Sequence, residues 1–485
     1  MPFTLKRPRR REFARSLVDA VKSMYTSDKR FSDGADPLRA HSAVHVYFHD
    51  GHRKYHPIMR LPNELLAHIF ALGAEDDIML PVVISHVCRA WRKLALHTPS
   101  LWRRVVLDSR LSMWTQRIHR AKACTLDIQL ANQQMSLDRT NYIVPLDAQT
   151  VLYYMHLVIP FIPRWRSLEI KFDIYTPYLW NAALSACCDS TPAVQAHFLR
   201  ELSLIYPGND DTKEFVLFNG VAPRLRRVTL WGIRLAWYPS LFQHLTFLDY
   251  THHGFTRGHE AASDVLQILQ VSSRLEVLRL AFPWRGDSNS RYSNPSARTT
   301  TLPRLATLTL SIEGPDIPPA LLHVLMHLSL PAIRTLRLVS RYPFRRPTLF
   351  PRLRHVLKAL PQLPTLRHLY VEYGWLDSRF VHPLVQSLPR LQHVVLHGPQ
   401  VDASFLQTLM STLRARRSAD GNWQPLRGLE LVRCEAISAE DIVAAVRAQP
   451  SSISVLYLRA CPRIEQAGLR KLKSSGVMVR TATAA

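Results

Sequence analysis

The sequence predicts an α/β protein in which a short three-helix segment precedes a long solenoid of parallel strands and helices. An apolar-x-x-apolar-x-apolar pattern recurs with a mean period of about 29 residues, and helical stretches separate its copies. Upstream, three short helical patterns follow one another. We expect an N-terminal segment over 1–57, the three helices over 58–104, about 11–12 repeats over 105–478 and a tail over 479–485.

Composition and charge narrow the class of protein. Apolar residues make up 47% of the 485 residues, so most of the chain can bury a core and a wholly disordered chain is excluded. The 62 Lys and Arg exceed the 37 Asp and Glu, which gives a formal charge of +25. This excess favours an acidic partner: nucleic acid, an anionic membrane or an acidic protein.

Cysteine usage and hydropathy bear on the compartment. Six cysteines are too few for a disulfide scaffold, and none forms a C-x-x-C pair. No run of about 18 apolar residues predicts a membrane helix, and the N-terminus lacks the apolar core of a signal peptide. We therefore expect reduced thiols and a cytoplasmic or nuclear location.

The first 57 residues are polar and show only a short helical pattern around Glu12–Met24 and a short strand pattern at Val44–Phe48. Five of the six residues from Lys6 to Arg11 are basic. Such a cluster is typical of a nuclear address or a nucleic-acid arm, and also of a solvated tail.

Three short helices are predicted next. The first ends at Gly73, a natural C-cap; Pro62 suits its first turn and Glu64 complements its positive end. The second spans Leu80–Ala90 and the third Trp91–Leu96. So small a segment cannot bury all its apolar side chains, so part of that face is left for a partner or for the rest of the chain.

These helices carry a family resemblance. The motifs L-P-x-E-L-L-x-x-I-F, S-x-V-C-R-x-W-R and T-P-x-L-W occur in order between Leu61 and Trp102, and this stretch resembles an F-box. The resemblance implies binding to the Skp-family adaptor of a cullin-based ubiquitin ligase; an ordinary helical subdomain is the alternative. The adaptor-facing residues that it implies are Leu61, Pro62, Glu64, Leu65, Ile69, Pro81, Val87, Cys88 and Trp91, of which Ile69 and Trp91 are also candidates for the core.

Downstream, the apolar pattern predicts one strand per copy because its last two apolar positions alternate with polar ones. Helical stretches such as Ala261–Gln270 and Ala439–Arg447 separate the copies, and Ser438 with Asp441 marks a helix start. The copies are Ala123/Leu126/Ile128, Trp165/Leu168/Ile170, Leu199/Leu202/Leu204, Leu225/Val228/Leu230, Leu245/Leu248/Tyr250, Leu275/Leu278/Leu280, Leu305/Leu308/Leu310, Ile333/Leu336/Leu338, Leu366/Leu369/Val371, Leu391/Val394/Leu396, Leu426/Leu429/Leu431 and Ile453/Leu456/Leu458.

The last two copies continue into Cys434 and Cys461 at the same offset. They resemble the cysteine-containing leucine-rich repeat common beside F-boxes, which implies that both thiols pack inward. The Pro- and Arg-rich L-P-x-L-R-x-L copies also resemble the large F-box families of fungi. Because copies before residue 165 are poor and the spacing varies, an irregular α/β domain is the alternative.

In such a solenoid, strand residues between the buried leucines face the concave surface. At these positions basic and acidic residues balance, and aromatic residues and histidines are frequent. This composition favours a protein partner over a phosphate backbone. The substrate-binding candidates are Trp231, Phe247, Arg279, Arg337, Tyr370, His393 and Tyr457.

The positions beside the first apolar residue of each copy are different, because they hold many arginines and one acidic residue, Glu276. The arginines are Arg164, Arg166, Arg200, Arg224, Arg226, Arg274, Arg304, Arg334, Arg367, Arg390 and Arg427. They are either solvated cover for apolar turns or a basic edge that attracts an acidic partner or nucleic acid. The polar insertion Arg285–Thr301 is either a contact loop or tolerated slack.

Sequence motifs for catalysis are missing: there is no P-loop, dinucleotide fingerprint, zincin or nucleophile-elbow pattern. We expect no catalytic residue, metal or cofactor. We expect a substrate-recognition adaptor of a ubiquitin ligase that binds the Skp-family adaptor and, through it, cullin, with its repeats holding a protein substrate. A nucleic-acid-associated scaffold is the alternative, and an enzyme is the third class.

Overall fold

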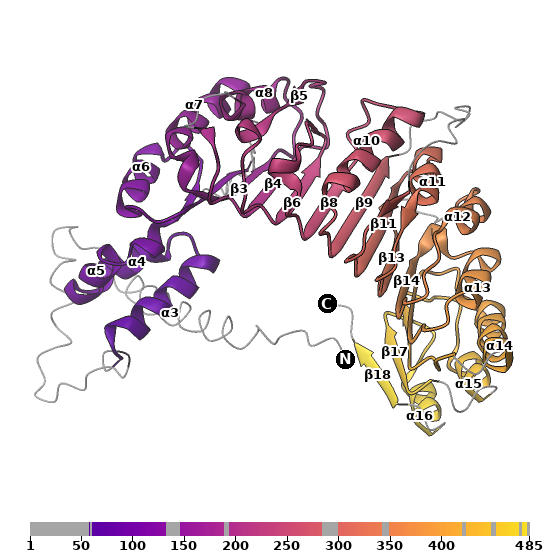
Figure 1. Cartoon of the computed structure of the whole chain (residues 1–485). Helices are drawn as coiled ribbons and strands as arrows, with labels where there is room; N and C mark the ends of the chain where they lie inside the picture. The colour runs from indigo at the N-terminus through magenta and orange to yellow at the C-terminus, as the bar shows by residue number, and fades with distance from the viewer. Residues whose placement is uncertain are drawn as a thin grey trace, which may run out of the picture. The chain divides into compact units, whose positions relative to one another are not determined.

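The computed structural model describes residues 58, 61–131, 146–188, 194–283, 299–341, 349–419, 423–447, 453–474 and 478–482. The helix and strand expected before residue 57, the basic cluster at Lys6–Arg11 and nearly all of the polar insertion lie outside these residues. The chain forms two compact units. The first extends to Leu130 and includes Arg164–Arg166, and the second contains 131–163 and 167–485 (Figure 1).

The first unit contains the three predicted helices. They are α3 (Asn63–Asp76), α4 (Leu80–Val87) and α5 (Arg89–Leu96), and the short 3-10 helix η3 (Pro99–Trp102) follows. The C-cap expected at Gly73 is wrong. The carbonyl of Gly73 accepts a hydrogen bond from the amide of Asp77 at 2.9 Å, so the helical bonding continues to Asp76 and Gly73 is buried inside α3.

The break between α4 and α5 lies at Cys88, two residues earlier than we expected. Cys88 is extended, with φ −156° and ψ 169°, and its Sγ accepts a hydrogen bond from the amide of Trp91 at 3.5 Å. Cysteine is an uncommon N-cap residue, which explains why the sequence pattern placed the boundary at Ala90.

Aromatic side chains form the core of the first unit. Phe70 of α3 packs edge-to-face on Trp91 of α5 at 4.8 Å between ring centroids. Trp102 is buried and donates from Nε1 to the carbonyl oxygen of Ala95 at 2.9 Å. The strand β1 (Arg104–Val106) pairs in parallel with β2 (Leu126–Ala131), and α6 (Leu111–Arg120) connects them. The compact unit therefore extends past the helices into one strand–helix–strand segment.

The second unit is a parallel sheet backed by helices. Its strands follow one another in chain order, except for two short two-stranded sheets, β5 with β7 and β10 with β12. In Figure 1 the strands of this unit line the inner side of the array and the helices the outer side. The main strands are β3 (Trp165–Lys171), β4 (Glu201–Ile205), β6 (Arg227–Trp231), β8 (Phe247–Thr251), β9 (Val277–Pro283), β11 (Thr307–Glu313), β13 (Thr335–Ser340), β14 (His368–Glu372), β15 (His393–His397), β16 (Gly428–Val432), β17 (Val455–Arg459) and β18 (Met478–Ala482).

The helices of the second unit lie where the repeat pattern placed them. The stretch predicted at Ala261–Gln270 lies in α10, and the start predicted at Ser438 is the N-cap of α15. The helices are α7 (Ala148–Val158), α8 (Leu179–Leu184), α9 (Pro239–Phe242), α10 (Gly258–Val271), α11 (Pro319–Met326), α12 (Leu353–Ala359), α13 (Ser378–Gln386), α14 (Ala403–Ala419), α15 (Ala439–Arg447) and α16 (Gln466–Ser474). Short elements are η4 (Ile159–Arg164), η5 (Ser185–Cys187), η7 (Leu217–Gly220), η8 (Tyr373–Trp375), β5 (Glu214–Phe215), β7 (Arg234–Leu235), β10 (Thr300–Thr301) and β12 (Leu328–Ser329).

The predicted repeats are confirmed as strands in a common register. In every copy, the last two apolar residues lie in a strand and are buried. These residues also pair with one another: Leu248 pairs with Leu278, and Leu429 with Leu456. The sheet also includes β18, which starts at Met478 and continues into the stretch that we expected to be a tail; there Val479 continues the ladder opposite Leu456.

Within the described part of the chain, no helix has the length and apolarity needed to cross a membrane.

Candidate functional site

Helix α3 has one buried and one open apolar face. Leu66, Phe70 and Gly73 are buried toward α4 and α5. On the adjoining side, about a quarter turn around the helix, Leu65 is 53% exposed and Ile69, four residues on, is only partly buried. Because residues four apart lie on one side of a helix, these two side chains form an apolar stripe that no described part of the chain covers completely.

The nine predicted adaptor-facing residues are not equally accessible. Pro62, Glu64 and Leu65 are exposed. Leu61, Ile69, Val87 and Cys88 are half-buried. Pro81 and Trp91 are buried, and Trp91 packs on Phe70. The accessible members therefore lie mainly at the start of α3 and at the junction of α4 and α5.

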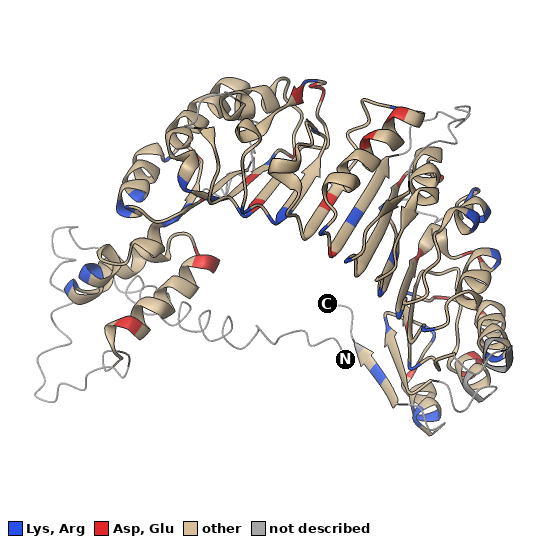
Figure 2. Cartoon of the chain, viewed as in Figure 1, with Lys and Arg blue, Asp and Glu red and all other residues tan. Residues whose placement is uncertain are grey.

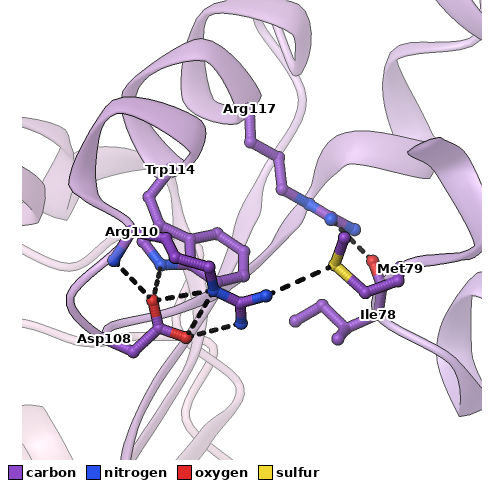
Figure 3. Close-up of polar contacts among 6 residues, drawn as sticks. All are labelled: Ile78, Met79, Asp108, Arg110, Trp114 and Arg117. Carbon is purple, nitrogen blue, oxygen red and sulfur yellow. Dashed lines mark hydrogen bonds and ion pairs between the residues drawn. The ribbon is translucent and has the colours of Figure 1, made fainter. Parts of the chain in front are cut away.

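A polar cluster supports this helical surface from the segment after β1 (Figure 3). Asp108 accepts hydrogen bonds from the Nη2 of Arg110 at 2.6 Å and from the indole Nε1 of Trp114 at 2.8 Å. Burial opposes ionisation of Asp108, but the hydrogen bonds from Arg110 and Trp114 outweigh it and hold the pKa of Asp108 below its usual value. The turn before α6 is thereby fixed.

Arg117 of α6 is a buried cation in the same cluster (Figure 3). Its guanidinium donates to the carbonyl oxygen of Ile78 at 2.7 Å and to that of Leu101 at 3.4 Å, and it lies over the rings of Trp102 and Trp114. Burial lowers the pKa of Arg117 to about 10, so it remains charged at neutral pH. The predicted sites do not include it, because its partners lie up to 39 residues away in the chain.

On the inner face of the second unit, arginines stack on the predicted aromatic residues. The guanidinium of Arg227 lies 4.2 Å from the ring centroid of Phe247, and that of Arg279 lies 5.3 Å from it. Arg279 also pairs with the nearly buried Asp249 at 3.3 Å. A guanidinium held between a ring and a carboxylate is fixed in orientation and still presents free N–H groups.

A second group on this face is built around Arg341, which follows β13. Its guanidinium lies 4.7 Å from the ring of Trp231 on β6, pairs with Glu313 of β11 at 3.2 Å, and reaches the hydroxyl of Thr251 on β8 at 3.4 Å. One side chain therefore ties four strands together. Sequence reasoning missed Arg341 because it lies outside the strand pattern, 90 residues from Thr251.

The third group lies on β14 and β15 and contains Tyr370. His397 Nδ1 lies 2.8 Å from the hydroxyl of Tyr370 and 2.9 Å from Glu372. The hydroxyl of Tyr373 lies 3.2 Å from His397 Nε2 and accepts from Arg433 at 3.3 Å. Burial, with Glu372 nearby, raises the pKa of Tyr370 to about 12. This network keeps Tyr370 a neutral hydrogen-bonding group.

His393 lies in a flat stack. Its ring is parallel to that of His368 on the neighbouring strand, with 4.9 Å between centroids and 8° between planes. On the other side lies Gly428, where a Cβ would come within van der Waals overlap of His393 Nδ1. Burial lowers the pKa of both imidazoles, and Arg367 and Arg427 lower it further.

All seven predicted substrate-binding residues face away from the core. Arg279 and Arg337 are exposed, and the other five are half-buried, whereas their apolar neighbours along each strand are buried. Arg337 stacks on Tyr370, and Arg480 of β18 stacks on Tyr457. Sequence reasoning also did not single out Tyr373, at the start of η8 after β14, or Arg433, directly after β16.

The two C-terminal cysteines occupy equivalent turns after β16 and β17. Cys434 Sγ donates to the carbonyl oxygen of Val432, and Cys461 Sγ to that of Leu431, both at 3.5 Å. A hydrogen bond between the two thiols lowers the pKa of Cys461 to about 7 and raises that of Cys434. Within the described ranges, no group of three or more His, Cys, Asp or Glu side chains is placed to hold a metal ion.

The geometry defines the class of this protein: a helical domain and a solenoid of the leucine-rich-repeat kind. A family model described as F-box-like matches residues 58–108, so the chain contains an F-box-like domain there. A solved structure titled "Crystal structure of TLR13-ssRNA13 complex" shares 17% sequence identity with a TM-score of 0.32, and the match covers 60% of this chain and 42% of that one. No curated protein matches the sequence.

Proposed function

We propose that this protein is the substrate-recognition adaptor of a Skp–cullin–F-box ubiquitin ligase. In this proposal the F-box-like domain binds the Skp-family adaptor protein, which connects the chain to cullin. The inner face of the solenoid binds a protein substrate. The chain supplies no catalytic group, and it acts in the cytoplasm, the nucleus or both.

The open apolar stripe of α3 carries the proposal. Full burial of a leucine side chain contributes about 1.5–3 kcal/mol relative to full exposure, and because Leu65 is 53% exposed, a partner helix or loop that covers it recovers part of this free energy. The stripe lies within the F-box-like match. The buried face of α3, with Phe70 on Trp91, holds the stripe on a rigid support.

The inner face supports the second half of the proposal. Its acidic residues are largely paired with its own cations, as Asp249 is with Arg279 and Glu313 with Arg341. Aromatic rings fixed by arginines are the residue types that contribute most to protein–protein binding. The mechanism is proximity, because holding a substrate lysine near a separate catalytic subunit raises its effective concentration.

The first test replaces two residues of the stripe. The double variant Leu65→Asp, Ile69→Asp places two carboxylates where an apolar contact must form, and their desolvation is costly. We expect pull-down of the Skp-family adaptor by the full-length chain to be lost.

The matched control is Ser112→Asp with Gln116→Asp, which adds the same charge at the same spacing on exposed positions of α6. This variant should capture the adaptor as the wild type does. Undiminished capture by the Leu65/Ile69 variant would show that the stripe is not the docking surface.

A further inference from the structure

The starts of the five strands from β11 to β16 carry uncompensated positive charge. The backbone forms one continuous row there: the amide of Arg367 donates to the carbonyl of Arg334, Gln392 to Arg367, and Arg427 to Gln392, at 2.7–2.9 Å. Arg304 and Arg390 lie two residues before this row, at the starts of β11 and β15. We call Arg304, Arg334, Arg367, Arg390 and Arg427 the arginine edge.

The five positions of the arginine edge include no acidic residue; the next acid in the same row is Glu276, before β9. All five side chains are exposed, and within the described part of the chain none of them forms an ion pair. The acids on the neighbouring inner face are engaged elsewhere, Glu372 with His397 and Glu430 with Arg459. Figure 2 shows the Asp and Glu positions dispersed among the Lys and Arg positions elsewhere in the unit.

This arrangement does not stabilise the fold. Arg334 and Arg367 are adjacent in the row, and neighbouring strands lie about 4.8 Å apart, so their like charges repel. The half-buried imidazoles next to the row sense the same field, because Arg367 and Arg427 add to the effect of burial in lowering the pKa of His368 and His393. A partner with negative charge removes this repulsion.

We propose that the arginine edge binds an acidic, extended segment of a protein partner. The inference rests on the proposed function in one respect, since it identifies this segment as part of the substrate. The edge spans the five strands from β11 to β16, about 19 Å at the usual strand spacing, which an extended segment of about six residues covers.

Charge and chemistry favour a protein segment over nucleic acid. Between β11 and β17 the row contains no aromatic side chain on which a base can stack, since its other members there are Ala306, Gln392 and Ser454. The adjacent inner face carries Glu372 and Glu430, which repel a continuous phosphate backbone. A peptide avoids this repulsion because it places carboxylates on the edge and apolar side chains on the inner face.

The test measures the anisotropy of a labelled twelve-residue peptide of alternating Glu and Gly, with full-length protein and increasing salt. The variant Arg334→Glu, Arg367→Glu, Arg427→Glu should bind at least about ten-fold more weakly, and the salt dependence should flatten. Arg354→Glu, Arg379→Glu, Arg414→Glu is the matched control, because these arginines are exposed on the helices of the same repeats.

Three outcomes would overturn the proposal: no binding of the peptide by the wild type, equal loss in the helix-face control, or tighter edge-dependent binding of a twelve-nucleotide single strand. If the Glu variant does not fold, the same three positions changed to Gln should still weaken binding. Adaptor pull-down, measured in parallel, should be unchanged by the edge variants. We expect the Leu65/Ile69 variant to lose adaptor pull-down and still bind the peptide. The two measurements therefore test the adaptor-docking proposal and the arginine-edge proposal independently.

Discussion

Individual side chains on the inner face gain their positions from neighbours that are distant in sequence. The alternation along each strand predicts that Tyr370 and Phe247 point outward, and they do. It does not predict that Arg341, after β13, reaches Trp231 on β6 past the three strands between them, because that contact depends on how the strands are stacked. The local pattern therefore predicted which way each side chain points, but it did not predict which distant side chains it contacts.

Cys461 should react with alkylating reagents faster than Cys434, the other C-terminal thiol. The hydrogen bond from Cys434 lowers the pKa of Cys461 and favours its thiolate, whereas the same bond and burial raise the pKa of Cys434 and keep it protonated. We expect iodoacetamide to label Cys461 in the native protein with a rate that rises through pH 7, as followed by mass spectrometry of peptides.

The buried Cys187 provides an internal control, since burial raises the pKa of its thiol above the usual range. Its labelling should appear only after denaturation. Faster labelling of Cys434 than of Cys461 would contradict the assignment of the thiolate.

At the level of single elements, the helix boundary at Ser438 was predicted correctly because a capping side chain marks it. Ser438 and Asp441 form the reciprocal pair that the S-x-x-D pattern predicts: Asp441 Oδ2 accepts from the Ser438 amide at 2.9 Å, and Ser438 Oγ accepts from the Asp441 amide at 3.2 Å. Glycine is a residue type that often ends a helix, but Gly73 does not end α3. It is buried inside the helix, where its lack of a side chain allows close packing.

Removal of this cap should destabilise α15 locally. We expect Ser438→Ala to lower the free energy of unfolding by about 0.5–2 kcal/mol, the usual cost of losing an N-cap side chain, as measured by urea denaturation. The exposed Ser411→Ala in α14 makes no cap and should change stability by much less. Equal effects of the two substitutions would contradict a capping role for Ser438.

At the scale of the whole molecule, one repeated register organises the second unit. The copies of the apolar pattern predicted its strands and their order, because each leucine row needs the next row to cover it. The extent of the first compact unit could not be predicted the same way. It depends on packing around Trp102, Trp114 and Arg117, which the helical pattern alone does not show.

In a solenoid of this kind, backbone amides are protected from hydrogen exchange most in strands that have a neighbouring strand on both sides. We expect amide hydrogen exchange to be slowest in a central strand such as β11, paired with β9 and β13, and fastest in β18, which pairs with β17 alone among the described strands. Mass spectrometry of proteolytic peptides measures this gradient. Uniform protection across all strands would indicate one cooperative unit instead.

The common register also bears on how such a protein changes during evolution. The buried rows contain mostly leucine, isoleucine and valine, whereas the residues that alternate with them carry the arginines, aromatic rings and carboxylates. Substitutions at the outward positions leave the packed rows intact and cost little folding free energy. New binding preferences are thus accessible by single mutations without passing through unfolded intermediates, and gain or loss of a complete repeat preserves the packing of the remainder.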